Sequence, residues 1–104
     1  MDLKQIIYLV LVGQDGFVEA IFPDKEEATR YAFKALKTFS VLTIEGTHFG
    51  ERTPIWAAEY DLIGSPYGSI IDGTFVRSSN EFRECVYERV DGEMKITSSR
   101  KVQI

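Results

Sequence analysis

One helix-like stretch, Asp24 to Thr38, constrains the fold of this chain more than any other feature. Asp24 is a favourable N-cap residue, and Pro23 ends the segment before it. The apolar positions recur at the spacing of a single helix face, namely Ala28, Tyr31, Ala32, Ala35, Leu36 and Phe39. The rest of the chain has the patterns of strands and turns. We therefore expect one main helix, at about residues 24–38, that covers a sheet.

The N-terminal half predicts four strands around this helix. Residues 5–12 are apolar on both faces, which indicates a strand covered on both sides, or covered on one side and paired at an interface on the other. The Asp15-Gly16 pair is a strong hairpin signal and leads into a strand at 17–22, whose single charge indicates an edge or a solvent-facing side. Two further strands are predicted at residues 41–44 and 55–62.

The segment after residue 64 predicts hairpins, with alternatives left open. Ser65–Gly68 is a turn by composition, and a strand follows from about residue 69 to residue 76. Within it, Asp72-Gly73 fits either a bulge or a second tight turn. Residues 78–86 fit either a single helical turn or the approach to a hairpin, and we prefer the hairpin.

A C-terminal hairpin is predicted in residue detail. Asp91-Gly92 between two strand-like runs fits a two-residue loop. Such a loop would place Tyr87 opposite Ile96 and Glu88 opposite Lys95, and both pairs are favourable.

These elements define an α+β fold, a mostly antiparallel sheet of five or six strands with one main helix packed on one face. With 104 residues the chain is predicted to be a single domain, 1–104, in which 1–64 form a β-β-α-β-β unit and 65–104 a hairpin extension of the same sheet. A helix of about 15 residues covers a strip only about 10 Å wide. Aromatic surface is therefore left over, and we expect a homodimer.

Charge and cysteine content restrict the partners. The net charge of −4 makes nucleic acid an unfavourable partner, so we expect a protein instead. The single cysteine, Cys85, cannot form an intramolecular disulfide, which fits the cytoplasm. The apolar run at residues 6–12 is too short to span a bilayer, so no membrane association is expected.

Several short segments of the first 64 residues occur in a familiar arrangement. They are Tyr8-Leu9-Val10, Asp15-Gly16, Ile21-Phe22, Asp24, Glu26-Glu27-Ala28, Tyr31-Ala32 and Glu59-Tyr60-Asp61-Leu62. This arrangement resembles the small stand-alone β-β-α-β proteins of unknown function found in phages and other mobile elements. The resemblance implies an accessory protein of a kind that includes inhibitors of host factors, and it implies no catalytic residue.

The sequence contains none of the common catalytic or nucleotide-binding motifs, so no catalytic residue and no cofactor are predicted. Glu45, His48 and Glu51, in the polar connection at residues 45–54, form the best set of potential metal or acid/base groups, and the alternative is a polar turn. Trp56 and Tyr60 share one strand face, as a stacking platform or as part of the core.

Three hypotheses of function follow. The first is a non-catalytic protein-binding module that inhibits a host factor. The second is a binder of a small nucleotide-like ligand, held by a loop or a dimer groove with Arg52 or Arg77 on its phosphate. The third is a metal-dependent hydrolase at Glu45, His48 and Glu51. The residues predicted to contact a ligand or partner are His48, Glu51, Arg52, Trp56, Tyr67 and Arg77.

Overall fold

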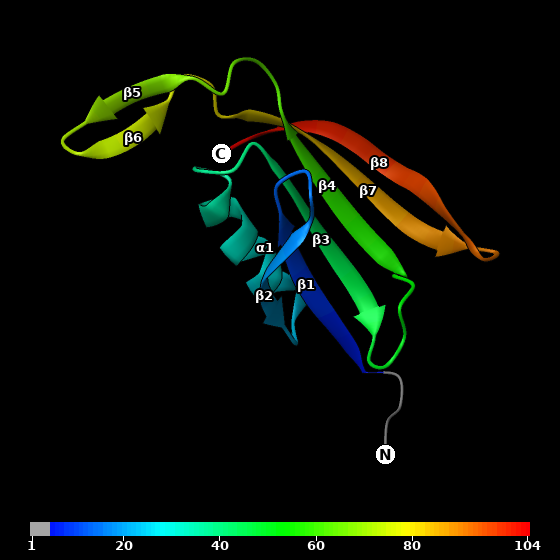
Figure 1. Ribbon diagram of the computed structural model, residues 1–104. Helices are drawn as coiled ribbons and strands as arrows, with labels where there is room; N and C mark the ends of the chain where they lie inside the picture. The colour runs from blue at the N-terminus through cyan, green and yellow to red at the C-terminus, as the bar shows by residue number, and fades with distance from the viewer. Residues whose placement is uncertain (1–4) are drawn as a thin grey trace.

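The computed structural model describes residues 5–104, so residues 1–4 of the predicted N-terminal unit lie outside it. The elements, in chain order, are β1 (Ile6–Val12), β2 (Phe17–Phe22), α1 (Lys25–Ala35), β3 (Val41–His48), β4 (Trp56–Leu62), β5 (Gly68–Ile71), β6 (Thr74–Arg77), β7 (Glu81–Val90) and β8 (Glu93–Gln103). Six strands form one antiparallel sheet in the order β2-β1-β3-β4-β7-β8. One helix lies on a face of this sheet, which confirms the α+β arrangement (Figure 1).

Helix α1 begins where the sequence predicts and ends earlier. The Asp24 carboxylate accepts a hydrogen bond from the Glu26 amide at 2.9 Å, as an N-cap does. The predicted end at residue 38 is wrong. The amides of Lys37 and Thr38 bond to carbonyls three residues earlier, a tightening typical of a helix end. No helix in the described chain has the length and apolarity needed to cross a membrane.

The core lies between α1 and the sheet. Ala28, Ala32 and Leu36 are buried on the helix, and the Phe33 ring meets Tyr60 of β4 edge-on, with centroids 5.7 Å apart. The helix packs chiefly on β1, β2 and β3. On the side of the sheet that carries the helix, strands β4, β7 and β8 are therefore less covered than β1, β2 and β3. The helix covers none of the opposite side of the sheet, which we call the open face (Figure 1).

Strand β3 is longer than predicted and includes residues 45–48, which the sequence assigns to a loop. Gly46 is the reason that the strand can continue there. A Cβ at this position would lie 2.9 Å from the Tyr8 ring, which occupies that space beside Trp56. In the sequence, Gly46 indicates a loop. In the structure it lies within a strand and is required there by packing.

The C-terminal hairpin has the predicted register. Tyr87 lies opposite Ile96 and Glu88 opposite Lys95, around a two-residue loop whose Asp91 and Gly92 have φ of 52° and 81°. Residues 81–90 are a strand, which decides against the helical turn. Asp72 and Gly73 have similar positive φ values, 51° and 77°, so they form a turn and not a bulge.

Residues 65–104 do not all extend the sheet. Strands β7 and β8 do, whereas within residues 5–104 β5 and β6 pair only with each other and form a separate two-stranded sheet. Figure 1 shows this hairpin projecting from the end of the body where α1 finishes. We call residues 67–77 the arm. Gly68 is needed at its base, because a Cβ there would lie 2.0 Å from the Val76 carbonyl oxygen.

Candidate protein-binding surfaces

The residues predicted to bind a ligand lie at opposite ends of strand β4. His48 ends β3, Glu51 and Arg52 follow in the loop, and Trp56 begins β4. Tyr67 and Arg77 lie beyond the other end of β4, at the base of the arm. A seven-residue strand separates the two groups by about 20 Å. A single copy of the chain therefore does not bring them into one site.

The potential metal ligands are also separated. Glu45 and His48 are three residues apart in a strand, so their side chains lie on opposite sides of the sheet. Glu51 instead forms an ion pair with Arg89, with 3.8 Å between Oε2 and Nη2. Within residues 5–104 no group of three or more His, Cys, Asp or Glu side chains is placed to hold a metal ion.

The two aromatic residues of β4 belong to the packed side of the sheet. The Trp56 ring meets Tyr8 edge-on, with centroids 6.1 Å apart, and the Lys25 Nζ lies 4.3 Å from its centre. Tyr60 is buried, and its hydroxyl donates to Glu84 at 2.5 Å. These contacts favour the core role for Trp56 and Tyr60 over a stacking platform.

Arg77 is buried and joins the arm to the end of α1. Its guanidinium donates to the carbonyl oxygens of Leu36, of Phe39 at 3.4 Å and of Ser79 at 2.9 Å. The carbonyl end of a helix carries partial negative charge, which compensates the buried cation. Burial lowers the pKa of Arg77. The sequence offers no signal for this role, because the two partners at the end of the helix, Leu36 and Phe39, lie about 40 residues away along the chain.

The arm exposes large apolar side chains. Five of them have between 44% and 79% of their area exposed: Tyr67, Ile70, Ile71, Phe75 and Val76. Ile70 lies opposite Phe75 on one face of the hairpin, and Ile71 and Val76 belong to the other face. The base is held by two hydrogen bonds from Ser78 to the Tyr67 carbonyl, at 3.0 and 2.7 Å. The arm is thus anchored at its base and apolar on both faces.

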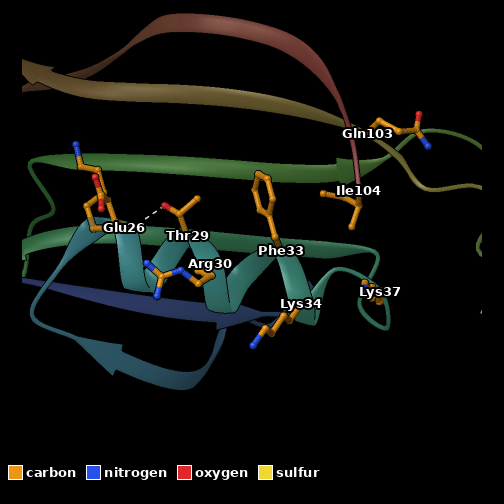
Figure 2. Close-up of a pocket in the computed structure, with 9 residues that line it drawn as sticks. Glu26, Thr29, Arg30, Phe33, Lys34, Lys37, Gln103 and Ile104 are labelled. Atoms are coloured by element: carbon orange, nitrogen blue, oxygen red, sulfur yellow. Dashed lines mark hydrogen bonds between the residues drawn. The ribbon is translucent and has the colours of Figure 1, made fainter.

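A groove runs between α1 and the C-terminal end of β8. It has a volume of about 640 Å³, and Figure 2 shows Phe33 rising from the helix toward the sheet with Ile104 across from it. Its charged lining residues are four cations and one carboxylate, namely Lys25, Arg30, Lys34, Lys37 and Glu26. The groove therefore combines apolar walls with a positive rim, in a chain whose net charge is −4.

The open face contains a smaller, acidic depression of about 340 Å³, lined in part by Glu45, Glu59 and Tyr87. Burial raises the pKa of Glu45, and the neighbouring Glu59 carboxylate raises it further. The same Glu59 carboxylate raises the pKa of Tyr87 by attracting its phenol proton. Strand alternation already indicates that Glu59 lies on the face opposite Trp56, but its proximity to Glu45 depends on the register of β3 against β4.

An α+β protein with one antiparallel sheet, one helix and a projecting apolar hairpin is thus the class that this structure defines. Comparisons with protein-family models, with curated proteins and with solved structures found no match to the chain.

Proposed function

We propose that the chain is a non-catalytic protein-binding module that contacts its partner through the arm. One observation carries this proposal: residues 67–77 project from the body with five large apolar side chains exposed. A two-stranded hairpin is only marginally stable in water by itself. Contact with another protein would bury these side chains and stabilise the hairpin at the same time.

The chemistry of the arm favours a protein over other partners. Tyr and Phe are the residue types enriched at protein interfaces, and Asp72 is the one charged residue between Tyr67 and Arg77 in the sequence. A nucleic-acid partner would need cations on this element, to neutralise phosphates. The chain also resembles accessory proteins of mobile elements, some of which inhibit host factors. We therefore propose that binding through the arm inhibits a cytoplasmic host factor.

The test compares two single substitutions of the same kind. Ile70 on the arm and Ile96 on β8 are 69% and 59% exposed, so lysine at either position should change the free energy of unfolding by no more than about 0.5 kcal/mol. Each variant and the wild-type chain is used to capture proteins from a host-cell lysate. The proposal predicts a protein retained by the wild type and by Ile96→Lys and lost with Ile70→Lys.

A captured protein that binds all three chains equally would contradict the proposal, as would one that is lost only with Ile96→Lys. Inhibition is tested by adding the chain to the captured protein in its own activity assay. The Ile70→Lys variant should then have no effect.

A further inference from the structure

We infer that the groove between α1 and β8 receives the arm of a second copy of this chain, so that two copies exchange arms. This inference rests on the proposed function, because it names a partner for the same arm. It depends on four features of the chain, which are the continuity of the groove with the arm, their matching lengths, their opposite charges and the symmetry of the exchange.

The groove leads to the base of the arm. A second depression of about 300 Å³ is lined by Thr74, Phe75 and Val76 of the arm, together with Lys37 and Ile104. Lys37 and Ile104 also line the larger groove. The groove and this second depression therefore adjoin at Lys37 and Ile104, beside the hairpin that projects beyond the helix.

The dimensions of the two surfaces agree. The lining residues of α1 extend from Lys25 to Lys34, a distance of about 14 Å along a helix, and Lys37 follows beyond its end. Each strand of the arm has four residues, which is about 13 Å of extended chain. An arm can therefore lie lengthwise within the groove, with Ile70 and Phe75 against Phe33 and Ile104.

The charges of the two surfaces are opposite. The groove has the four cations named above against Glu26, whereas Asp72 places a carboxylate at the tip of the arm. An apolar hairpin with an acidic tip thus matches an apolar groove with a basic rim. The apolar surfaces supply the buried area of the contact, and the opposite charges set its orientation. Because each copy has one arm and one groove, a reciprocal exchange closes at two copies.

The test reverses one charge on each side of the contact and then recombines the variants. Asp72→Lys puts a positive arm against a positive groove, and Lys37→Glu puts a negative arm against a less positive groove. We expect a dimer of the wild-type chain by light scattering, and each variant alone should weaken it at least about tenfold in Kd. A mixture of the two variants should bind more tightly than either variant alone, because one contact of the mixed species joins the acidic arm to the unchanged groove and the other places the substituted lysine of the arm near the substituted glutamate at position 37.

Two matched controls separate charge from fold. Asp91→Lys makes the same substitution in a turn with the same backbone, since Asp72 and Asp91 have φ of 51° and 52°. Lys101→Glu makes the other charge change on an exposed residue of the open face, opposite Arg83. Both control variants should remain dimeric, with the wild-type Kd.

Three results would overturn the inference. The first is a wild-type chain that stays monomeric up to its highest soluble concentration, which would still leave Ile70-dependent capture of another protein intact. The second is a dimer that neither Asp72→Lys nor Lys37→Glu weakens, especially one that Ile21→Lys on the open face dissociates. The third is a mixture of the two variants that remains monomeric while each control is dimeric.

Discussion

Arg77 is the single residue on which the position of the arm depends most. Its guanidinium binds carbonyl oxygens of Leu36 and Phe39 at the end of α1, while its main chain pairs with Gly68 in the arm. Removing the side chain would leave buried acceptors without a donor and would detach the hairpin base from the helix. The same residue therefore stabilises the core and holds the proposed binding element in place.

Arg77→Met should lower the free energy of unfolding by about 2–4 kcal/mol, because one buried and two partly buried hydrogen bonds to carbonyl oxygens are lost while the volume is largely kept. Arg52→Met, in an exposed loop, is the matched control and should change it by less than about 0.5 kcal/mol. Urea denaturation measures both. Equal effects would show that Arg77 does not support the end of the helix.

Glu45 should make stability fall as pH rises. Burial and Glu59 raise its pKa in the folded state, so the folded chain holds this proton more tightly than the unfolded chain does. The stabilising contribution is complete below the ordinary glutamate pKa and is lost as pH rises through the raised folded value. Glu45→Gln should therefore be more stable than the wild type at pH 7, by less than about 1 kcal/mol.

Thermal unfolding of the wild type and of Glu45→Gln, measured from below the ordinary glutamate pKa up to pH 7, gives the difference in stability between the two chains. The two chains should converge in stability at the acid end. A variant that is less stable than the wild type at pH 7 would mean that the Glu45 carboxylate is favourably paired in the folded state.

At the scale of the elements, helix α1 is held on the sheet by its buried face. Leu36 is fully buried next to the last turn, whereas Lys34 is exposed on the outer side. Leu36→Ala should cost about 2–4 kcal/mol through the cavity that it leaves, and Lys34→Ala should change stability by less than about 0.5 kcal/mol. Chemical denaturation of the two variants checks this. Similar costs at the two positions would place the buried face of the helix elsewhere.

The elements that the sequence predicts well are those specified by neighbouring residues. The Asp24 cap and the Asp91-Gly92 hairpin depend on contacts a few residues apart, so their patterns can be read locally. The length of β3 and the separate β5–β6 sheet depend on distant residues. Gly46 continues a strand because Tyr8 fills the space beside it, and nothing near Asp72-Gly73 indicates that its hairpin pairs with no other strand.

The candidate surfaces were predicted only in part, for the same reason. The sequence predicts surplus apolar surface, which the exposed side chains of the arm, Tyr67 among them, confirm, whereas the protein partner stays a prediction. It does not indicate that Arg77 is buried at a helix end, or that Glu45 lies near Glu59 and away from His48. Such relationships are set by sheet register and by packing between distant segments.

At the scale of the whole molecule, the chain is elongated, with principal extents of 50, 25 and 22 Å. The packed body holds the buried core, whereas the arm extends from one end with between 44% and 79% of each of its five large apolar side chains exposed (Figure 1). Stability should accordingly be uneven, with the central strands strongest and the arm weakest in the absence of a partner.

Amide hydrogen exchange of residues 68–77 tests whether the arm is the contact surface. It should be measured at low and high protein concentration, and again with any protein captured through Ile70. We expect arm amides to exchange much faster than those of β3 and β4 in the dilute chain, and to become protected on association. Arm amides that exchange at one unchanged rate under all of these conditions would show that the arm does not contact a partner.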